Sequence, residues 1–256
     1  QRSSGLALFL PHGNEGLGPE HSSARLERFL QLSADENMVI CAPTRASQIF
    51  HLIRRQMNQT FRKPLIMMSP KSMLRLPASR SPISRFLTGG YLNVIDDTRF
   101  EEAGGDRDQV RQVILCAGKV YYDLATRRDT VDRKDVALVR IEQLSPFPAG
   151  DVQRILDLYP NREQITWVQE EPRNHGAFFF VERCMRELLE LQVDDITRVA
   201  SPSPSGGSTA MHEQEQQEIV LAAIDGGGGR KSRSATSESP KNSKKTSGSK
   251  KTAPSN

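Results

Sequence analysis

Apolar residues along the chain form short runs that alternate with longer segments of helical spacing. Runs at 5–10, 37–43 and 63–69 are short, mostly apolar and bounded by Gly, Pro or polar residues, which predicts buried strands. Between them, segments 23–32 and 43–57 place apolar residues at helical spacing, with Ser22 and Ser23 as caps of the first. Strands and helices that alternate through short turns are typical of a parallel sheet.

A second block repeats this alternation after a stretch, 76–107, that is rich in Pro, Gly and Ser. We interpret that stretch as an ordered crossover with one extended piece at 91–95. The sequence therefore predicts an α/β protein with two parallel-sheet α/β domains. The strands predicted for the second block are 112–118, 135–141, 164–170 and an edge strand at 196–200, and its helices are 120–128, 150–158, 176–191 and 210–224.

Two predicted helices have a recognisable apolar side. In 43–57 the side expected to be buried carries Ile49, Phe50, Ile53 and Arg54. In 176–191 the residues available for burial are Phe179, Val181, Cys184, Met185 and Leu188.

Composition and charge narrow the class of protein. The chain has 256 residues, 36% of them hydrophobic, and no apolar run of membrane-spanning length or signal segment, so we expect a soluble globular protein. The net charge of +4 is uneven, because eight basic residues and one acid lie from Arg230 onward. Residues 226–256 lack apolar periodicity and predict a disordered, solubilising tail. Cys41, Cys116 and Cys184 are isolated in apolar surroundings, so we expect buried reduced thiols and no metal site.

The stretch from Leu10 to Arg25 is the main candidate for chemistry. It joins a predicted strand to a predicted helix and contains two histidines, two acids and three glycines. Such loops lie at the ligand-binding edge of open α/β sheets. His12 and His21 are candidate groups for binding a carboxylate or transferring a proton. The alternative is structural, with His21 capping a helix and His12 pairing with a backbone carbonyl.

Other charged groups have a structural alternative that we favour. Arg54 and Arg55 form a candidate anion or effector site, but a solvated basic helix face explains them as well. Glu170 and Glu171 could act as acid and base, although ion pairs or a subunit interface are the more common use of such a pair. We expect His212 on an exposed helix face. The segment 116–119 lacks the glycine and Ser/Thr of a phosphate loop, which excludes that interpretation.

Several motifs closely resemble the C-terminal part of the thiamine-diphosphate-dependent first component of 2-oxoglutarate dehydrogenase complexes. The resemblance covers about residues 5–224. Its motifs are Leu10-Pro11-His12-Gly13, Gly18-Pro19-Glu20-His21-Ser22-Ser23-Ala24-Arg25, Phe50-His51-Leu52 with Arg54-Arg55-Gln56, Arg62-Lys63-Pro64-Leu65, Ser69-Pro70-Lys71-Ser72, Gly118-Lys119-Val120-Tyr121-Tyr122-Asp123-Leu124, Arg140-Ile141-Glu142-Gln143-Leu144 with Pro146-Phe147-Pro148, and Gln169-Glu170-Glu171-Pro172.

The resemblance implies a division into four parts. Residues 1–75 correspond to the later part of a pyrimidine-binding domain, 76–108 to a linker or crossover, 109–225 to a transketolase-type C-terminal domain, and 226–256 to a tail without counterpart. It also implies thiamine diphosphate with Mg²⁺ as cofactor. The diphosphate and metal ligands of the family lie outside this chain, so we expect the chain to be inactive alone, either as a fragment or as a true truncated protein.

The resemblance further implies an activity, partners and site residues. The family decarboxylates 2-oxoglutarate in the tricarboxylic acid cycle and passes the succinyl group to a lipoyl arm. The implied partners are a second copy of the chain and the dihydrolipoyl succinyltransferase component with its lipoyl domain, and no membrane or nucleic acid. His21 matches the active-site histidine of the family, His12 is a second catalytic candidate in the same cavity, and Ser22 is a candidate for positioning the substrate.

The sequence leaves alternative functions open. The enzyme could act on a related 2-oxo acid such as 2-oxoadipate, as a dehydrogenase or a decarboxylase. A truncated, non-catalytic paralogue that binds full-length subunits is the alternative from another class. The short 31–37 link favours a bacterial cytoplasmic protein over one of the mitochondrial matrix.

Overall fold

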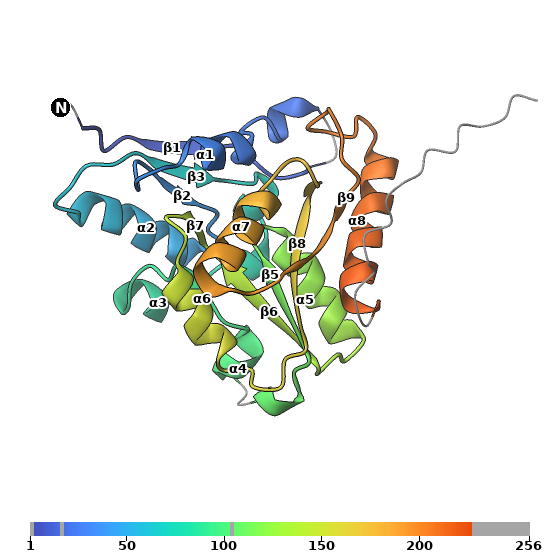
Figure 1. The fold of residues 1–256 in the computed structure, drawn as a ribbon. Coiled ribbons are helices and arrows are strands. Elements are labelled where there is room, and N and C mark those ends of the chain that lie inside the picture. Colours follow the sequence, from blue (N-terminus) through green and yellow to red (C-terminus); the bar gives the residue numbers. More distant parts are fainter. Residues whose placement is uncertain (1–2, 16–17, 103–104, 227–256) are drawn as a thin grey trace, which may run out of the picture.

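The computed structural model describes residues 3–15, 18–102 and 105–226, which form two α/β units packed side by side (Figure 1). The first unit contains β1 (Ala7–Leu10), α1 (Leu26–Leu32), β2 (Val39–Cys41), α2 (Ala46–Asn58) and β3 (Leu65–Met68). Its sheet has the order β1-β3-β2-β7, in which the first three strands are parallel.

The segment that connects β3 with β5 (Gln112–Cys116), which we call the connecting segment, consists of short elements and packs against both units. It contains α3 (Ser84–Leu87), β4 (Val94–Ile95), α4 (Thr98–Glu102) and the 3₁₀ turns Ser72–Leu74, Pro77–Ser79 and Arg107–Gln109. Its extended piece, β4, pairs antiparallel with a strand of the second unit, with Val94 opposite Ile141.

The second unit has the sheet order β4-β6-β5-β8-β9, with four parallel strands and β4 antiparallel at one edge. Its elements are β5 (Gln112–Cys116), α5 (Val120–Thr130), β6 (Val136–Ile141), β7 (Gln143–Ser145), α6 (Ala149–Leu156), β8 (Gln164–Pro172), α7 (Phe178–Leu189), β9 (Asp194–Arg198) and α8 (Thr209–Ile224).

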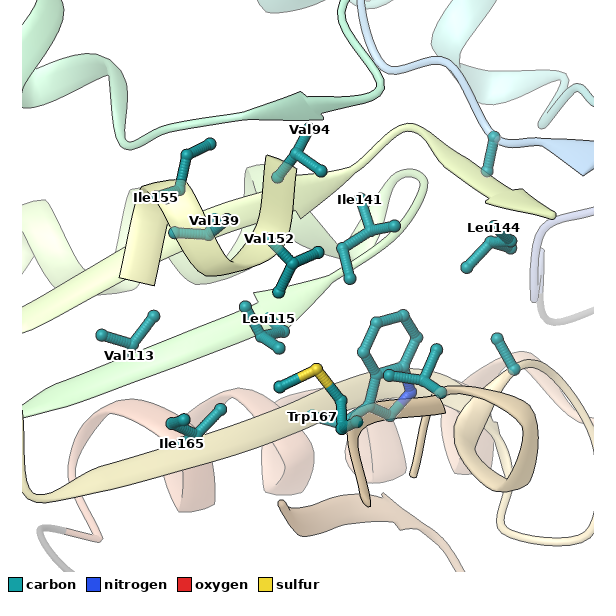
Figure 2. Packing of buried hydrophobic residues seen from close by; sticks show 14 of the residues in the cluster. Val94, Val113, Leu115, Val139, Ile141, Leu144, Val152, Ile155, Ile165 and Trp167 are labelled. Atoms are coloured by element: carbon teal, nitrogen blue, oxygen red, sulfur yellow. The ribbon is translucent and has the colours of Figure 1, made fainter. Parts of the chain in front are cut away.

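Both faces of this second sheet are buried, because alternate residues of its strands pack on different helices. Val113 and Leu115 of β5 belong to the cluster with α6 and α7, in which Trp167 is almost fully buried (Figure 2). Ile114 and Cys116 belong to the opposite cluster, with α5 and α8. Central strands that are apolar at every position are the pattern expected for a doubly covered parallel sheet.

The two units share a core and a strand. After β6, only Glu142 separates the second sheet from β7, which pairs antiparallel with β2 of the first sheet. The larger hydrophobic cluster contains Leu30 and Ile66 of the first unit together with Leu115 and Val152 of the second. The units are therefore held together by backbone hydrogen bonds as well as by apolar packing.

The α/β class with two sheets is confirmed, but both sheets are mixed rather than purely parallel, since β7 and β4 run antiparallel. The prediction that β1 is buried is wrong for this chain: it is an edge strand on which Phe9 is 53% exposed. The first helix begins at Leu26 rather than Ser23. Arg25 lies in the left-handed region (φ 58°), which ends the preceding loop, and neither serine caps the helix.

The predicted apolar side of α2 is also wrong. Phe50 and Ile53 are exposed, whereas Gln48, His51 and Leu52 are buried. Polar side chains can face inward here because the connecting segment supplies their partners. Gln48 donates to the Leu92 carbonyl (2.7 Å), and a ring nitrogen of His51 lies 2.7 Å from the Arg85 carbonyl.

Of the other expectations about buried residues, some are confirmed and some are wrong. All three cysteines are buried and free, as expected. On α7, Val181, Cys184 and Met185 are buried but Phe179 and Leu188 are exposed. His212 is not an exposed residue, because its ring contacts the Arg198 guanidinium at 3.1 Å.

Two further expectations concern the membrane and the tail. No helix within residues 3–15, 18–102 and 105–226 has the length and apolarity needed to cross a membrane. The predicted disorder of 226–256 concerns residues that, apart from Gly226, lie outside the described part of the chain.

Candidate functional site

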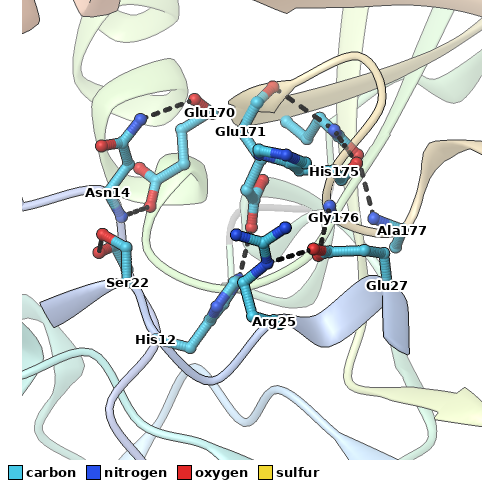
Figure 3. A network of polar contacts seen from close by, with 12 residues as sticks. His12, Asn14, Ser22, Arg25, Glu27, Glu170, Glu171, His175, Gly176 and Ala177 are labelled. Atoms are coloured by element: carbon cyan, nitrogen blue, oxygen red, sulfur yellow. Dashed lines mark hydrogen bonds and ion pairs between the residues drawn. The ribbon is translucent and has the colours of Figure 1, made fainter. Parts of the chain in front are cut away.

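A loop of the first unit meets the end of a strand of the second unit. The loop after β1 brings His12, Asn14 and Ser22, and the end of β8 brings Glu170 and Glu171 (Figure 3). A third contribution, Lys119, comes from the turn between β5 and α5. These are carboxyl ends of parallel strands, the edge at which α/β sheets place their functional side chains.

Four charged residues form the centre of this contact, and we name His12, Lys119, Glu170 and Glu171 the junction cluster. Lys119 Nζ lies 2.6 Å from Glu170 Oε2, and the two side chains are 14% and 6% exposed. The Asn14 backbone N–H donates to Glu170 Oε1 (2.8 Å), and the Asn14 amide donates to the Glu170 carbonyl (3.1 Å). Both carboxylate oxygens of Glu170 are therefore bound by donors from different units.

At the pair of Lys119 and Glu170, burial and ion pairing shift the pKa values in opposite directions. Burial raises the pKa of Glu170, and the charge of Lys119 offsets part of that effect. Burial acts to lower the pKa of Lys119, but the charge and hydrogen bond of Glu170 outweigh it, so the Lys119 pKa is raised. Because Lys119, the Asn14 N–H and the Gln216 amide (3.4 Å) all donate to the carboxylate, we describe the pair as ionised.

The second pair of the cluster joins His12 Nε2 to Glu171 Oε1 at 2.7 Å. Burial acts to lower the pKa of His12, but the hydrogen bond and charge of Glu171 raise it overall. The pKa of Glu171 is lowered in spite of burial, because His12 binds its charged form. Both shifts favour an imidazolium that donates to a carboxylate.

One ring atom of this histidine remains available. His12 Nδ1 is buried and has no partner among the described residues. In the imidazolium form it carries a proton, so it is a donor for a group that enters beside the cluster.

A glutamine holds the β8–α7 turn in position for these contacts. Gln169 Oε1 accepts from the indole of Trp167 and from the N–H groups of Ala177 and Phe178, and its amide nitrogen donates to the His175 carbonyl at 2.9 Å. Gly176 has a φ of +66°, and a Cβ there would lie 2.8 Å from Gln169. The position thus requires glycine, both for its backbone conformation and for space.

The helix that follows the first loop is fastened to the same turn. Glu27 Oε1 accepts from Arg25 Nε at 2.7 Å, and its other oxygen accepts from the Gly176 backbone N–H at 3.2 Å (Figure 3). The start of α1 is therefore tied to the second unit independently of the junction cluster.

His21 is more open than the other two predicted residues of its loop, His12 and Ser22. It ends a 3₁₀ turn, its side chain is 27% exposed, and Nε2 lies 3.3 Å from a carboxylate oxygen of Glu20. Its other ring nitrogen has no partner in the described part of the chain. The His21 carbonyl accepts from the Gly13 N–H at 3.3 Å, which joins the two ends of the loop and keeps both histidines on one loop scaffold.

Ser22 has a structural contact that the sequence did not reveal. It is buried, and its hydroxyl donates to the Gly13 carbonyl at 3.0 Å. Ser22 and His12 line one small cavity together with His175, and His21 is not part of that lining.

Arg54 and Arg55 lie elsewhere, on α2, and point in different directions. Arg54 is exposed, whereas the Arg55 guanidinium donates to Asn93 (3.0 Å) and Gln143 (2.7 Å) and lies 4.3 Å from the centre of the Tyr91 ring. Neighbours on a helix diverge by about 100°, so adjacency in sequence does not make a common site.

Glu170 and Glu171 form ion pairs within the chain, which is the use we favoured for them. Lys119, Asn14 and Gln169 were missed as site residues. The position of Lys119 directly after a predicted parallel strand was the available signal, whereas nothing local identified Asn14. Among the described residues no group of three His, Cys, Asp or Glu side chains could hold a metal ion.

Comparison with known proteins agrees with this architecture. Residues 1–77 match the model of the transketolase pyrimidine binding domain, which defines the class as transketolase-like. Residues 80–224, more than half of the chain, match the 2-oxoglutarate dehydrogenase C-terminal model, and the chain belongs to this family. The resemblance indicated by the sequence motifs is thus confirmed.

Curated relatives carry names from 2-oxoglutarate metabolism. The chain is 50% identical over 213 residues to the 2-oxoglutarate dehydrogenase E1 component of Cupriavidus necator, and the match covers 82% of this chain and 22% of the relative. The corresponding protein of Coxiella burnetii is 46% identical over 217 residues (82% and 23%). A multifunctional 2-oxoglutarate metabolism enzyme of Mycobacterium sp. (strain KMS) is 43% identical over 212 residues (82% and 17%). The chain spans less than a quarter of the length of each.

Proposed function

We propose that the chain is the C-terminal region of a 2-oxoglutarate dehydrogenase E1 component, in which the loop from Leu10 to Arg25 forms one wall of the active site. The observation that carries the proposal is the loop itself. It carries His21, whose buried Nδ1 has no partner among the described residues, while the junction cluster fastens the loop to the second unit. The identity to E1 components supports the choice of substrate, 2-oxoglutarate.

The roles follow from position. His21 is the proposed catalytic group, which contacts the substrate or the acyl group and supplies a proton or a positive partner. His12 is the second candidate, because it lines a small cavity with Ser22 and its buried Nδ1 has no partner among the described residues. Since the Ser22 hydroxyl already donates to Gly13, we propose that Ser22 acts by shaping the loop, with its remaining acceptor capacity directed to a ligand.

Thiamine diphosphate is the proposed cofactor, with Mg²⁺, and it supplies the carbanion that the decarboxylation of a 2-oxo acid requires. The donor set of the described residues does not offer a cation site, so the metal and diphosphate would be held by residues outside them. We therefore derive no step through the cofactor. What this chain contributes is orientation of the His21 loop.

The other parts of the proposal rest on the family alone. They are the division at 1–75, 76–108 and 109–225, a homodimer, a complex with the dihydrolipoyl succinyltransferase component and its lipoyl domain, and a place in the bacterial cytoplasm. The bacterial relatives support the last of these.

Replacing the imidazole tests the central assignment. In the full-length enzyme, His21→Ala should lower kcat with 2-oxoglutarate at least about tenfold, as expected for loss of a positioned acid–base group. Glu20→Ala is the matched control, because it removes the only carboxylate seen beside His21 in the described residues but leaves the imidazole in place. Unchanged turnover in His21→Ala, or equal losses in both variants, would remove His21 from the reaction.

A further inference from the structure

A second cavity, far along the chain from the His21 loop, lies between the connecting segment and α5. Its volume is about 330 Å³, within the range of small-molecule pockets. Its lining is dominated by guanidinium groups, from Arg45, Arg80, Arg85 and Arg140, with the rings of Tyr121 and Tyr122 as further wall.

Arg140 is the group in this lining that needs explanation. It lies near the C-terminal end of β6 and is only 1% exposed, although its side chain is a guanidinium. Nη1 donates to Thr44 Oγ1 at 3.0 Å, and the guanidinium lies 4.0 Å from the centre of the Tyr121 ring. Nε and Nη2 are buried and have no hydrogen-bond acceptor among the described residues. Two unsatisfied donors on a buried cation are costly unless a ligand or water accepts from them.

The nearest acidic side chains do not accept from the two unpaired donors of Arg140. Glu142 binds Thr44 with both oxygens, one through the backbone N–H at 2.8 Å and the other through the hydroxyl. Asp129 is the one acid among the lining residues, and it accepts from Arg128 at 3.0 Å. The lining therefore has four guanidinium groups against a single carboxylate that is already paired.

We infer that this cavity binds a small anion with at least two negative charges, a phosphate ester or a polycarboxylate, which the guanidinium groups of Arg80 and Arg140 hold. Parallel N–H donors of a guanidinium match two oxygens of either group. Arg80 adds charge at the exposed side of the cavity. The site is separate from Arg54 and Arg55, which are not among its lining residues, and the inference does not depend on the proposed function.

The test is a titration of the protein with inorganic phosphate and, separately, with citrate, followed by calorimetry at constant low ionic strength. Phosphate represents the phosphate-ester source and citrate the polycarboxylate source. We expect saturable binding of one equivalent of at least one probe, and the tighter of the two identifies the source. The deciding variants are Arg80→Gln and Arg75→Gln, which remove the same charge from the same exposed segment, although only Arg80 lines the cavity.

Arg80→Gln should weaken binding about tenfold, whereas Arg75→Gln should leave the dissociation constant within about twofold. Arg140→Lys keeps the charge but removes the paired donors, and it should abolish saturation while the circular dichroism spectrum is retained. If that variant does not fold, the comparison of Arg80 with Arg75 still decides. Lack of saturation by both probes, or equal weakening in the two glutamine variants, would overturn the inference.

Discussion

Two groups of buried charges lie where the units meet, and they are satisfied to very different degrees. In the junction cluster each acid has a direct ionic partner, Glu170 with Lys119 and Glu171 with His12. In the group of Thr44, Arg140 and Glu142, a neutral hydroxyl stands between the two charges, and Arg140 keeps two donors without a partner among the described residues. In the first arrangement every charge is paired directly, although His12 Nδ1 has no partner among the described residues, whereas in the second the two charges meet only through a hydroxyl.

The largest effect should come from breaking the junction cluster. Lys119→Met leaves the carboxylate of Glu170 buried without its ionic partner, so we expect a loss of about 3–5 kcal/mol in the free energy of unfolding. Urea denaturation followed by circular dichroism measures it. Lys134→Met, at a lysine that is 67% exposed, should change stability by less than about 0.5 kcal/mol. A loss below about 1 kcal/mol in Lys119→Met would mean that the hydrogen bonds from Asn14 and Gln216 are enough to hold Glu170.

A smaller loss in the free energy of unfolding is expected in the group of Thr44, Arg140 and Glu142. Arg140→Met removes the hydrogen bond to Thr44 and the contact with Tyr121, but Glu142 keeps both bonds from Thr44, so the expected cost is about 1–3 kcal/mol. The same denaturation experiment measures this cost, with the surface variant Arg154→Met as control. A loss equal to that of Lys119→Met would show that Glu142 depends on the charge of Arg140, and the contrast between the groups would disappear.

The smallest expected effect is a pH dependence of the free energy of unfolding, and it has opposite signs for His12 and His212. The pKa of His12 is raised in the folded protein, so its contribution to stability is present below its ordinary value of about 6.5 and is lost as pH rises through the folded value. The pKa of His212 is lowered by burial and by the Arg198 charge, so stability at this residue should instead rise with pH up to about 6.5.

The measurement compares unfolding free energies of the wild type with His12→Gln and His212→Gln across pH 5 to 9, about the range in which histidine titrates. The advantage of the wild type over His12→Gln should shrink toward high pH, and its advantage over His212→Gln should grow from low pH. Parallel curves for both variants would contradict the assignment of His12 as a paired imidazolium.

The central strands β5 and β6 of the second unit could be predicted from sequence because each is apolar at nearly every position, which is a local property. β7 could not, since Gln143-Leu144-Ser145 has no apolar pattern and pairs only because β6 delivers it to the edge of β2. The face of α2 was mispredicted because Gln48 and His51 find partners in the connecting segment. Of the site, the loop and its histidines were visible in sequence. The pairing of His12 with Glu171 was not, because it joins residues 159 positions apart.

The pairing of β2 with β7 also sets an order of events during synthesis. Ile40 and Cys41 meet Ser145 and Gln143, which leave the ribosome about a hundred residues later. Until then the outer edge of β2 has unpaired backbone groups, the kind of edge that recruits other strands. The first sheet therefore cannot be completed before β5 and β6 of the second sheet have been synthesised, and separate expression of residues 1–75 would release a sheet with that edge open.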